Sequence, residues 1–127
     1  MSELDQAVRA VVRDCLGVKD CEEVLVVCNP ATRSLGEAMR DEAAEAGADA
    51  VMAVISERDS HAAEPPRTVA QAMVAADVVL APTVQSLSHT AARKRASEAG
   101  ARIATLPGVT EEMLARVMSA DMAELRR

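Results

Sequence analysis

The chain has 127 residues, 50% of them hydrophobic, a net charge of −6, and no Phe, Tyr or Trp. This length and composition predict a single folded domain, 1–127, and exclude a disordered chain. The negative charge and the lack of aromatic rings argue against a protein that binds nucleic acid or anionic membranes, so neither is expected as a partner.

The length of the apolar runs and the spacing of the cysteines indicate in which compartment the protein is expected. No apolar run approaches the length of a transmembrane helix, and the first residues do not resemble a signal peptide. The three cysteines, Cys15, Cys21 and Cys28, have no paired spacing of the kind found in metal sites. We therefore expect a cytoplasmic protein with reduced thiols.

Helices and strands are predicted to alternate along the chain. Apolar residues at helical spacing indicate helices, short continuous apolar runs indicate buried strands, and Gly17, Gly47 and Gly100 are the expected helix ends. Thr68 is expected to cap the third helix. The expected order is helix 4–16, strand 22–29, helix 33–46, strand 48–56, helix 69–76, strand 77–83, helix 88–99, strand 101–107 and helix 110–119.

This alternation predicts an α/β fold. The junction EAGADAVMAVI at 45–55 recurs as EAGARIATLPG at 98–108, which favours repeated helix–turn–strand units. We expect a small doubly wound, mainly parallel four-stranded sheet in the order 2-1-3-4, flavodoxin-like or half-Rossmann, with helices on both faces. The strand order reverses between the first and third strands, so their carboxyl ends mark the expected ligand crevice.

Polar residues at this crevice are the candidate ligand-binding residues. Hydroxyl groups, a guanidinium and free helix amides suit an anionic or amide-bearing small molecule. The alternative is structural: the threonine after the first strand caps a helix and the arginine beside it is solvated. The candidates are Thr32, Arg33, Thr83, Ser86 and His89.

No catalytic residue and no metal ligand is predicted. The run CNPATRSLGE after the first strand has a single glycine, so it lacks the dinucleotide-binding fingerprint. Ser88 and His89 are adjacent and would point in different directions, which makes them a poor nucleophile–base pair. Asp59 and His61 lie in a polar loop and could ligate a metal, but exposed polar residues are commoner in loops, and the sequence has no HExxH motif. Cys28 lies within an apolar strand, where cysteine usually packs.

The run SLSHTAARKRASEAGARIATLPGVTEEML at 86–114 resembles part of a known family. It is similar to the N-terminal domain of the thermophilic metalloaminopeptidases (the aminopeptidase T or leucyl aminopeptidase family), which also include 2,5-dihydroxypyridine dioxygenase-like proteins. Further matches are VLVV at 24–27, NPAT at 29–32, DVVLAPT at 77–83 and ARIATLPG at 101–108.

The resemblance implies that the metal ligands of such an enzyme lie in a second, catalytic domain outside this chain. A divalent metal is therefore expected only in that missing domain, and no cofactor is expected in this chain. The resemblance also implies a hydrolase family, but it leaves open whether this chain is itself an enzyme.

Two functions are expected. The first is a non-catalytic structural or interaction domain that packs on the catalytic domain or pairs with a second copy as a homo-oligomer. The alternative is a stand-alone small-ligand-binding or enzymatic α/β domain that uses the crevice at the carboxyl ends of the first and third strands.

Overall fold

The computed structural model describes residues 3–57, 63–85, 87–106 and 113–114. The helix predicted over 110–119 lies mostly outside these residues, as do Asp59 and His61. The elements follow in the order α1 (Glu3–Arg9), a π-helical segment η1 (Ala10–Cys15), β1 (Glu23–Cys28), a 3-10 turn η2 (Pro30–Thr32), α2 (Arg33–Glu45), β2 (Asp49–Val54), α3 (Arg67–Ala75), β3 (Val78–Ala81), α4 (Ala91–Glu98) and β4 (Arg102–Thr105).

The strands form one parallel sheet in the order β2-β1-β3-β4, which confirms the predicted α/β fold and strand order. β1 lies inside the sheet and pairs along its whole length with β2, from Glu23 opposite Asp49 to Cys28 opposite Val54. After Glu23 every residue of β1 is buried. A strand covered on both faces needs apolar side chains at every position, which explains the unbroken run VLVVC.

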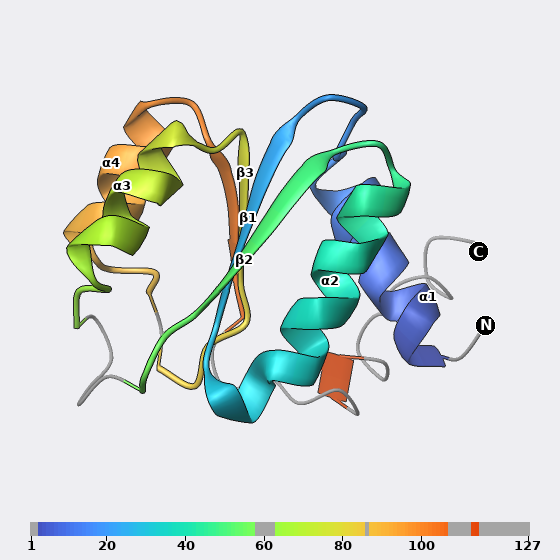
Figure 1. Cartoon of the computed structure of the whole chain (residues 1–127), viewed down its shortest axis with the longest axis horizontal. Helices are drawn as coiled ribbons and strands as arrows, with labels where there is room; N and C mark the ends of the chain where they lie inside the picture. Colours follow the sequence, from blue (N-terminus) through green and yellow to red (C-terminus); the bar gives the residue numbers. More distant parts are fainter. Residues whose placement is uncertain (1–2, 58–62, 86, 107–112, 115–127) are drawn as a thin grey trace, which may run out of the picture.

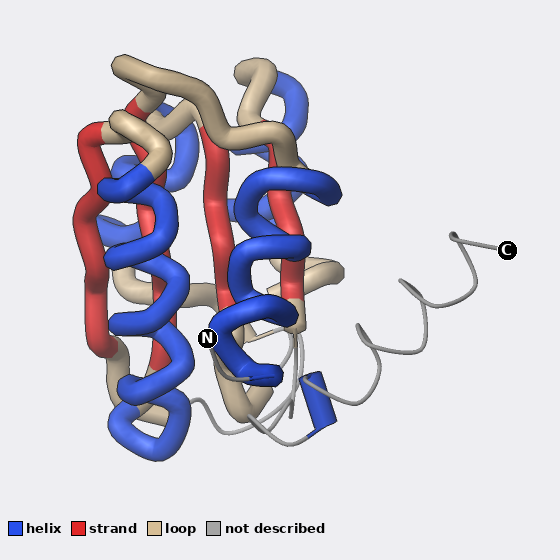
Figure 2. Tube along the Cα trace, turned by 90° about the vertical axis from the view of Figure 1, so that its right-hand side faces the viewer, coloured by secondary structure: helices blue, strands red, loops and turns tan. Residues whose placement is uncertain are grey.

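Helices cover both faces of the sheet (Figure 1). α1 and α2 lie side by side over one face, where Leu35, Met39 and Leu80 are fully or almost fully buried (Figure 2). α3 and α4 cover the other face, where Leu25, Met73 and Leu87 belong to a second core. Aliphatic side chains and methionines therefore fill both layers without any aromatic ring.

Two helices differ from their predicted form. The helix expected over 4–16 changes to π-helical geometry after Arg9, where the Leu16 amide bonds to the Val11 carbonyl at 3.1 Å. α3 begins at Arg67, so Thr68 lies within the helix and does not cap it. The cause is Pro66, whose extended ψ of 146° places the first helical residue directly after it.

α4 begins later than predicted. It starts at Ala91, with Thr90 as the capping residue, so Ser88 and His89 precede the helix. The Thr90 hydroxyl accepts a hydrogen bond from the Arg93 amide at 3.1 Å, which satisfies one of the free amides of the first turn. In the part of the chain that the structure describes, no helix has the length and apolar character needed to cross a membrane.

Candidate functional site

Asn29 is the central residue at the carboxyl end of β1. Its side chain is buried, with 2% exposure. The amide nitrogen donates to the Ile55 carbonyl at 2.9 Å, and the amide oxygen accepts from the Val84 amide at 2.6 Å. Ile55 follows β2 and Val84 follows β3, so one side chain joins the ends of three neighbouring strands. Both ends of the amide are thereby bonded to the protein's own backbone.

Thr32 and Arg33 stand at the junction of η2 and α2. The buried Thr32 hydroxyl accepts from the Asn29 backbone amide at 3.0 Å and lies 3.3 Å from the Asn29 carbonyl, to which it donates. The Arg33 side chain is 63% exposed and pairs with Glu37 one turn further along α2. The threonine therefore braces the turn, and the arginine lies at the surface.

Thr83 lies in the loop after β3, the strand that neighbours β1. It is buried, and its hydroxyl donates to the Gln85 carbonyl at 2.5 Å. The structure thus brings Thr32 and Thr83 to the same edge of the sheet as Asn29, which bonds to Ile55 directly after β2 and to Val84 in the loop after β3. Ser86, the other candidate of this loop, lies outside the described residues.

His89 is exposed at the turn before α4. Its neighbour Ser88 shares a hydrogen bond of 2.6 Å with the hydroxyl of Thr105, at the end of β4. Ser88 and His89 therefore belong to a turn that is fastened to β4.

The N-terminus of α4 is occupied by a carboxylate of the same chain. One oxygen of Glu64 accepts from the Ala91 amide at 2.7 Å, and the other accepts from the Ala92 amide at 3.0 Å. An anion is the group that the free amides of a first turn prefer. Glu64 takes this place from the loop before α3, 27 residues before Ala91.

Cys28 is fully buried at the end of β1. Burial raises the pKa of its thiol, which keeps it protonated and poorly nucleophilic. A Cβ atom on Gly36 would lie 2.9 Å from the Cys28 sulfur, so the glycine allows α2 to pack directly on this thiol. Cys28 therefore serves packing, in agreement with the expectation for an apolar strand.

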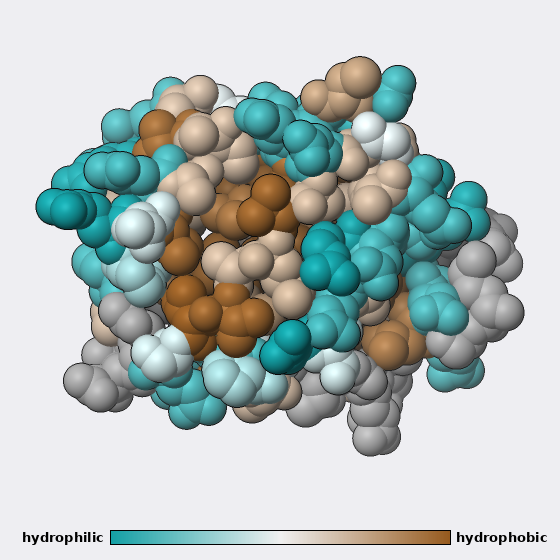
Figure 3. Space-filling view, in the orientation of Figure 1, coloured by the Kyte–Doolittle hydropathy of each residue, from teal (hydrophilic) through white to brown (hydrophobic). Residues whose placement is uncertain are grey.

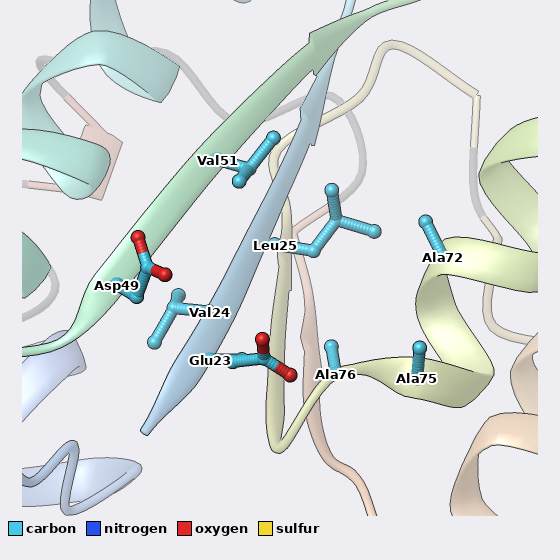
Figure 4. A pocket seen from close by; sticks show the side chains of 8 residues that line it. All are labelled: Glu23, Val24, Leu25, Asp49, Val51, Ala72, Ala75 and Ala76. Carbon is cyan, nitrogen blue, oxygen red and sulfur yellow. The ribbon is translucent and has the colours of Figure 1, made fainter. Parts of the chain in front are cut away.

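A second feature lies away from this edge, between β2 and α3 (Figure 4). It is a shallow hollow of about 170 Å³. Leu25 and Val51 point into it from β1 and β2, and alanines of α3 face them. Two carboxylates, those of Glu23 and Asp49, stand at one end. The lining residues are Glu23, Val24, Leu25, Asp49, Val51, Ala72, Ala75 and Ala76.

The hollow belongs to a broader apolar patch. In Figure 3 hydrophobic side chains gather in the middle of the face, between the polar surfaces of α3 and α2. Val51 is 59% exposed and Val54 is 41% exposed, which is unusual for valines of a sheet. A contiguous exposed apolar patch rimmed by polar residues is typical of a protein contact surface.

The chemistry of the two features differs. At the carboxyl edge, the side chains of Asn29, Thr32 and Thr83 are bonded within the chain, and no buried side-chain nitrogen or oxygen of the described residues lacks a partner. Among these residues, His, Cys, Asp and Glu side chains nowhere gather in a group of three that would hold a metal. The β2–α3 hollow offers apolar surface and two carboxylates, which suit contact rather than bond cleavage.

Sequence reasoning missed Asn29 and Glu64 as organising residues. Asn29 carried one signal, a lone polar side chain between a buried strand and a proline. Glu64 carried none, because its partners are 27 and 28 residues away.

The comparisons with known proteins agree with this fold. No protein-family model and no curated protein matches the chain. A 2,5-dihydroxypyridine dioxygenase from Pseudomonas putida KT2440 is similar with a TM-score of 0.66 and 17% identity, over 81% of this chain and 34% of that chain. AmpT from Thermus thermophilus is similar with a TM-score of 0.58 and 18% identity, over 91% of this chain and 41% of that chain.

At such identity these likenesses show the fold. This chain spans well under half of either solved structure. The chain is therefore distantly related in structure to a part of a dioxygenase and to a part of an aminopeptidase.

Proposed function

We propose that this chain is a non-catalytic interaction domain, equivalent to the N-terminal part of an aminopeptidase T-like protein. It packs through the apolar patch at β2 and α3, either on a catalytic domain or on a second copy of itself. A divalent metal belongs to that catalytic domain. The support is the fold shared with AmpT, together with the sequence resemblance to the same family.

The observation that carries the proposal is the contrast between the two surfaces. The crevice where an α/β domain usually binds a ligand is braced by Asn29, whose amide is bonded at both ends. The face at β2 instead exposes Val51 and Val54 beside an apolar hollow. Apolar surface of this kind is stabilised by contact with another protein surface.

The test measures association and catalysis on the same purified chain. Sedimentation velocity over a wide range of concentration should show a mass above that of the monomer. Hydrolysis of leucine p-nitroanilide with added Zn²⁺, Co²⁺ or Mn²⁺ should stay at the level of the metal-only blank. Metal-dependent hydrolysis by this chain would contradict the non-catalytic role, and a monomer at every concentration would contradict pairing with a second copy.

A further inference from the structure

The outer edge of β2 is unpaired among the residues that the structure describes. β2 is the first strand in the order β2-β1-β3-β4, and no other described strand pairs with its second edge. Figure 1 is viewed onto this edge, with β2 crossing in front of β1. An open edge presents unpaired backbone amides and carbonyls, which readily bond to a further strand.

The hydrogen bonds show which residues of β2 face outward. The Asp49 amide bonds to the Glu22 carbonyl and the Ile55 amide to the Cys28 carbonyl, so odd-numbered residues turn their backbone groups toward β1. Backbone groups alternate in direction along a strand. The even-numbered residues therefore present their amides and carbonyls outward: Ala50, Met52 and Val54.

This edge lacks the features that usually protect an edge strand. The six residues DAVMAV contain no Lys, Pro or Gly, and β2 pairs in regular register with β1 along its whole length. Natural edge strands are commonly protected by lysine, proline or a bulge, because an apolar regular edge pairs with other chains. Here the edge strand is regular, is apolar after Asp49, and contains two exposed valines, Val51 and Val54.

We propose that β2 pairs antiparallel with β2 of a second copy, around a two-fold axis at Met52, to form a continuous eight-stranded sheet. This inference rests on the proposed interaction role and names its partner. The outward residues Ala50, Met52 and Val54 are symmetric about Met52. A two-fold axis there pairs Met52 with itself and Ala50 with Val54, so every outward backbone group is bonded.

The side chains are self-complementary in this register. Val51 lies opposite Ala53 of the second copy on the α3 side, and Val54 lies opposite Ala50 on the α2 side. Each exposed valine thus meets a small residue, which lets the strands approach without a clash. Asp49, the one charged residue of β2, lies opposite Ile55 of the second copy. The two Asp49 residues of the dimer thus lie at opposite ends of the paired strands. Like charges therefore do not meet across the axis.

The helices leave room for this pairing. α2 packs against both β1 and β2, which places it over these two strands. With strands spaced about 4.8 Å apart, the two α2 helices would lie roughly 10 Å apart, within the range of packed helices. The two hollows between β2 and α3 would then face the same side of the joined sheet.

The first experiment introduces a charge at the edge. Val51→Lys should raise the dimer dissociation constant by roughly tenfold or more, because each ammonium would be placed in an apolar strand pair. The fold should be retained, since Val51 is 59% exposed. Val74→Lys is the matched control: Val74 is 41% exposed on α3 and should leave the dimer unchanged. A dimer that persists with Val51→Lys overturns the edge pairing but leaves the interaction role intact.

The second experiment fixes the register by disulfide formation. It uses a background in which the exposed Cys15 and Cys21 are replaced by serine. Val51→Cys mixed with Ala53→Cys should give a cross-linked dimer on mild oxidation, because directly opposed non-hydrogen-bonded residues lie about 4.5 Å apart.

Each cysteine variant alone is the control for the register. Identical residues would be diagonal neighbours about 7–8 Å apart, too far for a disulfide, so each variant alone should cross-link little. Efficient cross-linking by Val51→Cys alone would overturn the axis at Met52. If Val51→Lys loses association but the chain hydrolyses peptides, the proposed edge pairing is supported and the non-catalytic role is refuted.

Discussion

At the scale of single residues, Asn29 decides what the carboxyl edge of the sheet can do. Polar side chains at this edge often point toward a ligand. The Asn29 amide instead bonds to the backbone after β2 and after β3. Buried backbone groups need such partners, and loops that follow strands cannot supply them through regular pairing. The side chain therefore acts as a brace between three loops.

This role predicts a stability effect. Asn29→Ala should lower the free energy of unfolding by about 2–4 kcal/mol, because the Ile55 carbonyl and the Val84 amide lose a buried partner. Asn29→Asp should be more destabilising at neutral pH than below about pH 4, since its buried carboxylate would face a carbonyl. Urea unfolding measures both variants. Gln71→Ala, which truncates an exposed amide on α3, is the control and should change little. An Asn29→Ala variant as stable as that control would disprove the brace.

At the scale of elements, α4 depends on contacts from outside itself. It has 8 residues, and a helix of this length is marginal without caps and packing. Thr90 caps it locally, whereas Glu64 reaches it from the loop before α3. The two caps satisfy different amides of the first turn, so together they fix where the helix begins.

Removal of the distant cap should weaken the domain. Glu64→Ala should cost about 0.5–2 kcal/mol in urea unfolding, through the lost bonds to Ala91 and Ala92 and the lost charge at the helix N-terminus. Glu98→Ala is the matched control at the opposite end of α4, where a negative charge opposes the helix dipole. It should be neutral or slightly stabilising. If both variants lowered the free energy of unfolding equally, the idea that Glu64 caps α4 would be refuted.

At the scale of the whole molecule, Arg102 joins the segment before β1 to β4. Its guanidinium donates to the Leu16 and Gly17 carbonyls at 2.9 and 3.4 Å, and to the Glu22 carboxylate at 2.7 Å. The pairing with Arg102 lowers the pKa of Glu22 and raises the pKa of Arg102. The loop before β1 is thereby held against β4 across β1 and β3.

The lowered pKa of Glu22 gives a pH dependence with a definite sign. The ion pair stabilises the fold at pH values above the ordinary carboxyl pKa of 4.5, and this contribution is lost as the pH falls through the lower folded pKa. Glu22→Gln should therefore cost up to about 1 kcal/mol at neutral pH and nothing in strong acid. Thermal unfolding at several pH values measures the difference. Glu37→Gln, from an exposed pair with Arg33, is the control. A loss for Glu22→Gln that did not vary with pH would contradict the assignment.

The order of the elements and the layers of the fold could be predicted from the sequence. The unbroken apolar runs at β1 and β3 required strands buried on both faces, and the helices between them required parallel crossovers. Gly17, Gly47 and Gly100 end their helices with positive φ, as predicted. These features depend on the period of apolar residues and on local backbone geometry, which neighbouring residues encode.

The roles of the polar and exposed residues could not be predicted from the sequence, because they depend on the packing of the whole domain. Nothing local distinguishes a threonine that awaits a ligand from Thr32 or Thr83, whose hydroxyls are bonded within the chain. Likewise VMAV at β2 and VLVV at β1 are similar runs, yet one is an open edge and the other is interior. Hydrogen-bond partners far along the chain, and the place of a strand within its sheet, are set by the packing of the whole domain. For this reason the sequence predicted the sheet, while the structure identified its braced crevice and its open edge.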